Sequence, residues 1–143
     1  TIQREKTILL VEDNEINRIV LSRQLEVIGY KTDFAKNGKD GFDKWDTGGY
    51  DIILCDCQMP LVDGFEMASM VRIREAETNS DRIPIIAITA NVLKGDADKC
   101  FAYGMDDYIC RSCLHLKPAF SILGLIDQKY LAELGLFYLL IEY

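Results

Sequence analysis

Short runs of apolar and β-branched residues alternate along this chain with longer amphipathic segments. The plainest apolar runs are residues 8–11, 52–55 and 85–88, and two shorter, more polar runs continue the same rhythm at 31–35 and 107–110. A continuously apolar strand is typical of a parallel sheet that is covered on both faces, and the segments between the runs are suited to crossover helices. The pattern predicts five βα units.

The first intervening segment has the clearest helical pattern, because its apolar residues recur at helical spacing, at Ile16, Val20, Leu21, Leu25 and Ile28. Gly29 comes next as the expected C-terminal cap. Further helices are expected from Gly38 to the glycines at 48–49, over 65–76 and around 96–103. We therefore predict an α/β, flavodoxin-like, doubly wound fold with five parallel strands in the order 2-1-3-4-5 and helices on both faces, in which ligands bind at the carboxyl ends of the strands.

Length and charge narrow the class of protein. The chain has 143 residues, of which 49% are hydrophobic and 27% charged, which fits one ordinary globular domain. Its net charge of −7 disfavours direct contact with nucleic acid or with anionic membranes. The longest apolar run, residues 136–141, is far shorter than a membrane span. We expect a cytoplasmic protein with no membrane contact by this segment.

The cysteine and histidine content limits the available chemistry. Five cysteines form an odd set, so reduced thiols are expected rather than a disulfide framework. The single histidine, His115, disfavours a His-ligated metal site or a His-dependent hydrolase. Cys110 and Cys113 have CxxC spacing, but a redox pair belongs after a first strand, so a redox function is disfavoured. Cys55 and Cys57, on either side of Asp56, are expected to be structural residues that fill the packing around the strand end.

Acidic and hydroxyl side chains stand at the ends of three predicted strands. Glu12 and Asp13 come after the first, Asp56 after the third and Thr89 at the end of the fourth. In the predicted strand order these ends lie at one edge of the sheet. Three carboxylates so close must raise a pKa or recruit a cation, and an all-oxygen site suits Mg²⁺. With a metal present, Asp56 could act as a nucleophile toward phosphorus.

Four motifs in order resemble the response regulator receiver domain over roughly residues 6–112. They are Ile8-Leu9-Leu10-Val11-Glu12-Asp13-Asn14, Cys55-Asp56-Cys57-Gln58-Met59-Pro60 with Asp63-Gly64, the segment 85–90, and Gly104-Met105-Asp106-Asp107-Tyr108. The residues from Glu12 to Arg18 are most similar to receivers of hybrid sensor histidine kinases. Four ordered motifs are far more specific than a single glycine-rich loop.

The resemblance implies a two-component phosphorelay module. Asp56 would accept a phosphoryl group from a histidine of a kinase or of a histidine phosphotransfer domain. Glu12, Asp13, Asp56 and the backbone carbonyl of Gln58 would hold Mg²⁺, since the family pattern places that carbonyl two residues after the aspartate. Thr89 would then bind a phosphoryl oxygen, and Tyr108 would turn inward, changing the surface of the fourth and fifth βα units where partners dock.

One position departs from the family pattern. A lysine followed by proline is expected three residues after the aromatic switch, and Arg111-Ser112 stands there. Arginine keeps the charge but replaces a compact ammonium with a planar fork. The spacing from Thr89 favours Arg111 as the phosphoryl-binding cation, and Lys117, which precedes Pro118, is the weaker candidate.

The C-terminal segment is assigned separately. We expect a receiver domain over residues 1–118 and an apolar extension over 119–143, which would be a linker or the start of a following segment. An exposed apolar tail would associate, so a homodimer through this tail or through the fourth and fifth units is a possible arrangement.

Two other functions remain as alternatives. The first is a pseudo-receiver that works by protein contacts, with phosphorylation impaired because Arg111 replaces the lysine. The second is a metal-dependent phosphatase with an aspartate nucleophile. It is disfavoured because Gln58, which cannot serve as a general acid, stands where a second acid would be needed.

Overall fold

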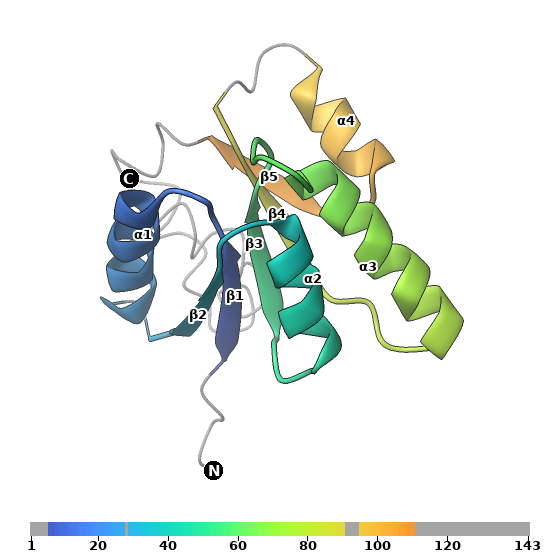
Figure 1. Ribbon diagram of the computed structural model, residues 1–143, viewed down its shortest axis with the longest axis horizontal. Helices are drawn as coiled ribbons and strands as arrows, with labels where there is room; N and C mark the ends of the chain where they lie inside the picture. The colour runs from blue at the N-terminus through green and yellow to red at the C-terminus, as the bar shows by residue number, and fades with distance from the viewer. Residues whose placement is uncertain (1–5, 28, 91–94, 111–143) are drawn as a thin grey trace, which may run out of the picture.

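The computed structural model describes residues 6–27, 29–90 and 95–110, and these contain five strands and four helices (Figure 1). In chain order they are β1 (Thr7–Val11), α1 (Glu15–Val27), β2 (Lys31–Ala35), α2 (Gly38–Asp46), β3 (Ile52–Asp56), α3 (Gly64–Thr78), β4 (Ile85–Thr89), α4 (Asp96–Ala102) and β5 (Asp107–Cys110). The predicted elements are confirmed, with ends shifted by two residues or fewer for most of them. The expected extension over residues 119–143 lies outside the described residues.

The strands form one parallel sheet in the order β2-β1-β3-β4-β5, as predicted. Successive side chains of a strand point to opposite faces of the sheet, and paired residues of neighbouring strands point to the same face. The apolar strands therefore supply two separate cores, one on each face. Leu9, Ile53 and Ile85 belong to one core, and Leu10, Leu54 and Ile86 to the other. Because both faces are buried, β1, β3 and β4 are apolar almost throughout.

Helices lie on both faces of the sheet, with α1 on one face and α2 and α3 on the other (Figure 1). Helix α1 contributes Leu21 and Leu25 to its core and ends at Val27, and Gly29 shortly after it has a φ of 95°, the left-handed conformation that a glycine cap supplies. Within the described ranges, no helix is long and apolar enough to cross a bilayer.

The apolar pattern of α1 is only partly buried. Ile16 is 71% exposed and Val20 38% exposed, and Ile19 is 46% exposed, although two of these side chains fit the helical repeat in the sequence. A repeat at helical spacing shows which residues share a face, but not whether the sheet covers that face. The amino-terminal half of α1 therefore presents apolar side chains to the surface.

The opposite face carries the aromatic residues of α2. Phe42 and Trp45 pack against the core beneath α2 and α3, with their ring centroids 5.7 Å apart. Gly41 allows the helix to approach the sheet, because a Cβ there would lie 2.9 Å from Val11 Cγ2. This packing holds α2 close to β1, the strand that leads into the acidic pair.

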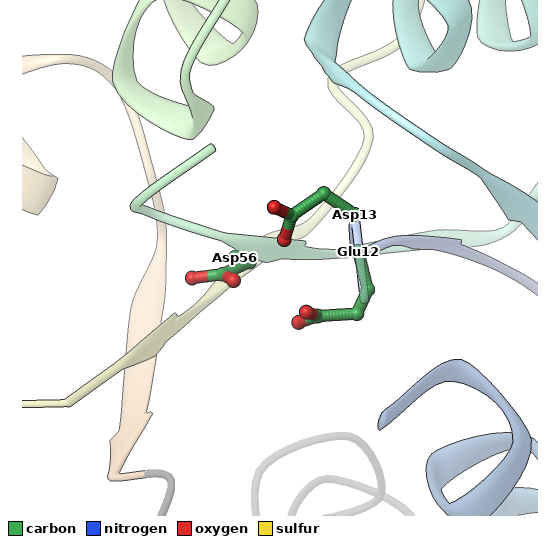
Figure 2. A group of neighbouring side chains, drawn as sticks. All are labelled: Glu12, Asp13 and Asp56. Carbon is green, nitrogen blue, oxygen red and sulfur yellow. The ribbon is translucent and has the colours of Figure 1, made fainter. Parts of the chain in front are cut away.

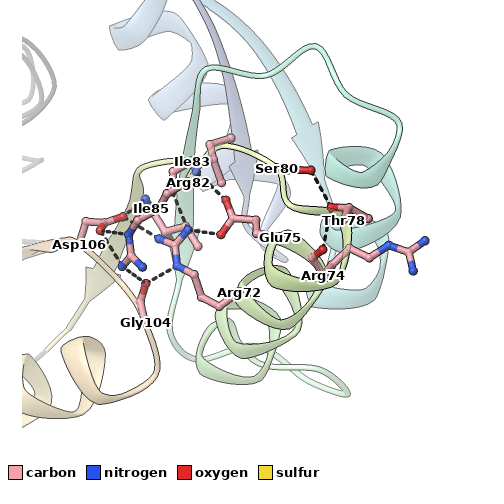
Figure 3. A network of polar contacts seen from close by, with 10 residues as sticks. All are labelled: Arg72, Arg74, Glu75, Thr78, Ser80, Arg82, Ile83, Ile85, Gly104 and Asp106. Carbon is pink, nitrogen blue, oxygen red and sulfur yellow. Dashed lines mark hydrogen bonds and ion pairs between the residues drawn. The ribbon is translucent and has the colours of Figure 1, made fainter.

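A polar network ties α3 to the amino end of β4 and to the loop before β5 (Figure 3). The Arg72 guanidinium donates to Glu75 Oε1 at 2.7 Å, to Asp106 Oδ2 at 2.7 Å and to the carbonyls of Ile83 and Gly104. Asp106 also accepts from the Ile85 amide at 2.8 Å and from Arg82. The network therefore fixes the end of the sheet opposite to the predicted site.

Candidate metal and phosphoryl site

The strand register brings the predicted acids together. Val11 of β1 pairs with Cys55 of β3, so the next residues along each strand, Glu12 and Asp56, emerge side by side at the carboxyl edge. Carboxylate oxygens of Glu12, Asp13 and Asp56 all lie within 4.8 Å of one another. Figure 2 shows the three side chains converging from the two strand ends. The clustering predicted from the sequence is therefore confirmed.

Burial and charge act together on this cluster. Glu12 is 1% exposed and Asp56 3% exposed, whereas Asp13 is exposed. Burial, together with the smaller effect of the Asp56 charge, raises the pKa of Glu12 to about 7. Such crowding favours a bound cation, and the oxygen ligands that three carboxylates offer fit a hard ion such as Mg²⁺.

The loop after β3 is shaped around Asp56. The Gln58 amide donates to Asp56 Oδ1 at 3.1 Å, which orients the carboxylate. Gly64, the first residue of α3, lies against the same backbone, since a Cβ there would be 2.3 Å from the Asp56 carbonyl oxygen. Each residue of the Asp63-Gly64 motif thus has a structural reason. Asp63 caps α3 by accepting a hydrogen bond from the Glu66 amide. Gly64 is needed because no larger residue fits so close to the end of β3.

The other predicted switch residues lie on the neighbouring strands. Thr89 is buried at the end of β4, in register with Cys110 of β5. Tyr108 is half-buried on β5, and its ring meets that of Phe101 in α4 edge to face, with centroids 6.1 Å apart. Arg111 and Lys117 both lie outside the described residues.

A cavity of about 380 Å³ opens beside Thr89. Its lining comes from the loop after β3, the start of α3, Thr89 and α4, and includes Gln58, Met59, Phe65 and Lys99. The Lys99 ammonium lies 4.3 Å from the centroid of the Phe65 ring. Neither Phe65 nor Lys99 was expected at the site from the sequence, because their proximity depends on how α4 packs.

The structural role of Arg18 was not predicted either. Its Nη1 donates to the carbonyl oxygens of Glu12 and Asp13, each at 2.9 Å. The residue falls within the stretch that resembles hybrid-kinase receivers, but a contact from a helix back to the preceding turn has no signature in composition or periodicity.

Three of the described cysteines, Cys55, Cys57 and Cys100, are buried. Burial raises the pKa of the Cys55 thiol well above its usual value, which makes it a poor nucleophile. The structural interpretation of Cys55 and Cys57 is supported. Cys113, the second residue of the CxxC pair, lies outside the described residues.

Comparison with protein families decides what kind of domain carries this site. Residues 8–115 match the model of the response regulator receiver domain. The chain belongs to the response regulator receiver family. The predicted resemblance is confirmed, and the parallel sheet of order 2-1-3-4-5 is the fold of its structural neighbours.

The curated relatives of this receiver domain include hybrid histidine kinases. It is 38% identical over 131 residues to hybrid signal transduction histidine kinase F of Dictyostelium discoideum, and the match covers 91% of this chain and 11% of the relative. It is 44% identical over 109 residues to the hybrid signal transduction protein dokA of the same organism, covering 76% of this chain and 6% of the relative. The chain therefore spans only a small part of these relatives.

Two solved receiver structures are also similar. One is the receiver domain of Ssk1 in complex with the histidine phosphotransfer protein Ypd1 of Saccharomyces cerevisiae, with a TM-score of 0.71, 30% identity, and coverage of 78% of this chain and 81% of that one. The other is the receiver domain of a Pseudomonas aeruginosa sensor histidine kinase with magnesium in its active-site cleft. Its TM-score is 0.67 and its identity 37%, covering 76% of this chain and 86% of that one.

Proposed function

We propose that this receiver domain accepts a phosphoryl group from a phosphohistidine onto Asp56 as one step of a phosphorelay, within a protein of the hybrid histidine kinase type. The observation that carries the proposal is the cluster of Glu12, Asp13 and Asp56, with carboxylate oxygens within 4.8 Å at the carboxyl edge of the sheet. Two similar receivers support the same assignment, since one was solved with magnesium in its cleft and the other in complex with a histidine phosphotransfer protein.

The residues divide the chemistry among them. Asp56 attacks phosphorus, so that an O–P bond forms while the P–N bond breaks and the departing imidazole takes up a proton. Glu12, Asp13, Asp56 and the Gln58 carbonyl would hold Mg²⁺, which neutralises charge on the transferring phosphoryl oxygens. Thr89, at the end of the next strand, would donate its hydroxyl to a phosphoryl oxygen. Arg111 would supply the remaining positive charge, with Lys117 as the alternative.

The output would be a change of surface. Once Thr89 is engaged by the phosphoryl group, the Tyr108 ring would rotate inward and leave its contact with Phe101. That motion alters the junction between α4 and β5, which shifts the population of partner-binding conformations without any turnover.

The proposal is tested by mass spectrometry after incubation with acetyl phosphate, with and without Mg²⁺. A single Mg²⁺-dependent phosphoryl adduct is expected in the parent chain and not in Asp56→Asn. An adduct that does not need Mg²⁺, or one that persists in Asp56→Asn, would contradict the proposal.

A pseudo-receiver is the second candidate, favoured by Arg111 at the position of the family lysine. In that case the parent chain would form no adduct, while Arg111→Lys would gain one. The same experiment therefore separates a working receiver from an interaction module whose site has been switched off.

A further inference from the structure

The turn that carries both amino-terminal acids is held by one side chain. Arg18 of α1 reaches back over the turn, and its Nη1 donates to the Glu12 carbonyl at 2.9 Å and to the Asp13 carbonyl at 2.9 Å. Hydrogen bonds from a charged donor are stronger than neutral ones. A single guanidinium thus fixes the backbone of two successive residues whose side chains enter the acidic cluster.

The guanidinium is itself held in place. Its Cζ lies 5.2 Å from the centroid of the Phe34 ring, a distance at which the ring attracts a cation. Lys44 lies 5.4 Å from the same ring and donates to the Phe34 carbonyl, which fixes the aromatic residue on the edge strand β2. Phe34 therefore offers a defined surface for Arg18 although it is 44% exposed.

The Glu12 amide also donates to the Ala35 carbonyl at 3.1 Å, and two further contacts act on the Glu12 side chain. Its Oε1 accepts from the Asn14 amide at 3.2 Å and from Asn17 Nδ2 at 3.4 Å. Asn14 also caps α1 by accepting from the Asn17 amide at 3.0 Å. These contacts orient one carboxylate, whereas Arg18 controls the backbone of both acids, including the exposed Asp13.

We propose that Arg18 is a positioning residue for the Mg²⁺ site. It holds the Glu12–Asp13 turn so that both carboxylates face Asp56, and Phe34 holds Arg18 in turn. This inference rests on the proposed function, because it takes the acidic cluster to be the metal site. Groups that orient metal ligands in this way commonly change metal affinity when they are mutated.

The geometry makes arginine specific at this position. A guanidinium is planar, so it can lie on an aromatic ring while an N–H group faces the two carbonyls. A lysine would keep the positive charge as a single ammonium without that planar surface. Arg18→Lys should therefore keep part of the wild-type Mg²⁺ affinity, and Arg18→Gln should keep less.

The test is isothermal titration of the full chain with MgCl₂, comparing the wild type with Arg18→Gln, Arg18→Lys and Phe34→Leu. Arg18→Gln is expected to weaken Mg²⁺ binding about 10-fold, with smaller losses in the other two variants. Arg23→Gln, an exposed arginine of the same helix, is the matched control and should retain wild-type affinity.

A second measurement separates positioning from mere stability. With acetyl phosphate as donor, Arg18→Gln should need about 10-fold more Mg²⁺ for half-maximal labelling of Asp56, yet approach the wild-type rate when Mg²⁺ saturates. Equal Mg²⁺ affinity in the wild type and Arg18→Gln, with or without a lower melting temperature, would overturn the role of Arg18 alone. Absence of Mg²⁺ binding in the wild type would overturn the metal site and this inference together.

Discussion

Glu12 is almost fully buried next to another acid, and that position determines its protonation. Burial and the charge of Asp56 raise the pKa of Glu12 from 4.5 to about 7. Between these two pH values the carboxyl group is protonated in the folded state and ionised in the unfolded state. A group whose pKa is raised on folding stabilises the protein below its unfolded pKa, and that contribution is lost as the pH rises through about 7. The metal-free protein should therefore lose stability between pH 5 and pH 8.

Glu12→Gln tests this linkage, because glutamine keeps the shape and cannot ionise. In EDTA at pH 8 the variant is expected to be more stable than the wild type by roughly 1 to 3 kcal/mol, and at pH 5 the difference should shrink. Urea unfolding at the two pH values measures the effect. Glu26→Gln, on the exposed surface of α1, is the control. Parallel pH profiles for wild type and Glu12→Gln would contradict this linkage.

Site residues could be predicted from the sequence when their position follows directly from the end of a strand. The acids at 12, 13 and 56 were predictable, since parallel strands bring their carboxyl ends to one edge. The contacts of Arg18 with the turn, and of Lys99 with Phe65, were not predictable, because they depend on side-chain directions between elements whose packing the sequence does not state. The same holds for the close approach of Gly64 to β3.

Helix α3 is joined to the far end of the sheet by a largely buried cation. Arg72 is 14% exposed and bridges Glu75, which is 7% exposed, and Asp106, which is 33% exposed (Figure 3). Removing Arg72 leaves the buried Glu75 carboxylate desolvated and incompletely paired. Arg72→Ala is therefore expected to lower the free energy of unfolding by about 3 kcal/mol, as measured by urea denaturation.

The same helix offers a matched control for that substitution. Arg74 is 44% exposed and pairs with Asp46 at 3.2 Å across the surface between α3 and α2. An exposed pair in water contributes little, so Arg74→Ala should change stability much less. If the two substitutions had equal effects, the network around Arg72 would not be the main attachment of α3 to β4 and the loop before β5.

Helix α1 combines a buried face with an exposed apolar one. Ile16, Ile19 and Val20 form an exposed patch on the helix that begins directly after the acidic pair. A protein that delivers a phosphohistidine to Asp56 must lie against this edge of the domain. Under the proposed function, we therefore expect this patch to contact the protein that carries the phosphohistidine.

Ile16→Asp tests the patch, because a charge there would face the apolar surface of the partner. Transfer from a phosphorylated histidine phosphotransfer protein should slow about 10-fold, while labelling by acetyl phosphate should stay at the wild-type rate. Ile73→Asp places the same charge on α3, where the isoleucine is 58% exposed, and should have little effect on either reaction. A loss of both reactions in Ile16→Asp would point to a disturbed site instead of a docking surface.

Across the domain, the order and direction of the strands were predictable because three of them are apolar almost throughout. Such strands require cover on both faces, and crossover helices make them parallel. The polar network at the end of the sheet opposite to the site could not be predicted. Strand β4 ends at Thr89, one residue after the partner of Asp56 in the sheet, and its first residue, Ile85, is held by Asp106 of the opposite network. That division arises from contacts between residues 21 or more positions apart in the chain.

Trp45 is an intrinsic fluorescent probe of the domain that lies far from the acidic cluster. It is the single tryptophan of the sequence, and it lies near the end of α2, packed against Phe42 and the core beneath α2 and α3. Since α2 runs antiparallel to the strands, this indole lies away from their carboxyl ends. Its emission will report unfolding of that face faithfully, and an unchanged fluorescence signal during a Mg²⁺ titration will say nothing against binding.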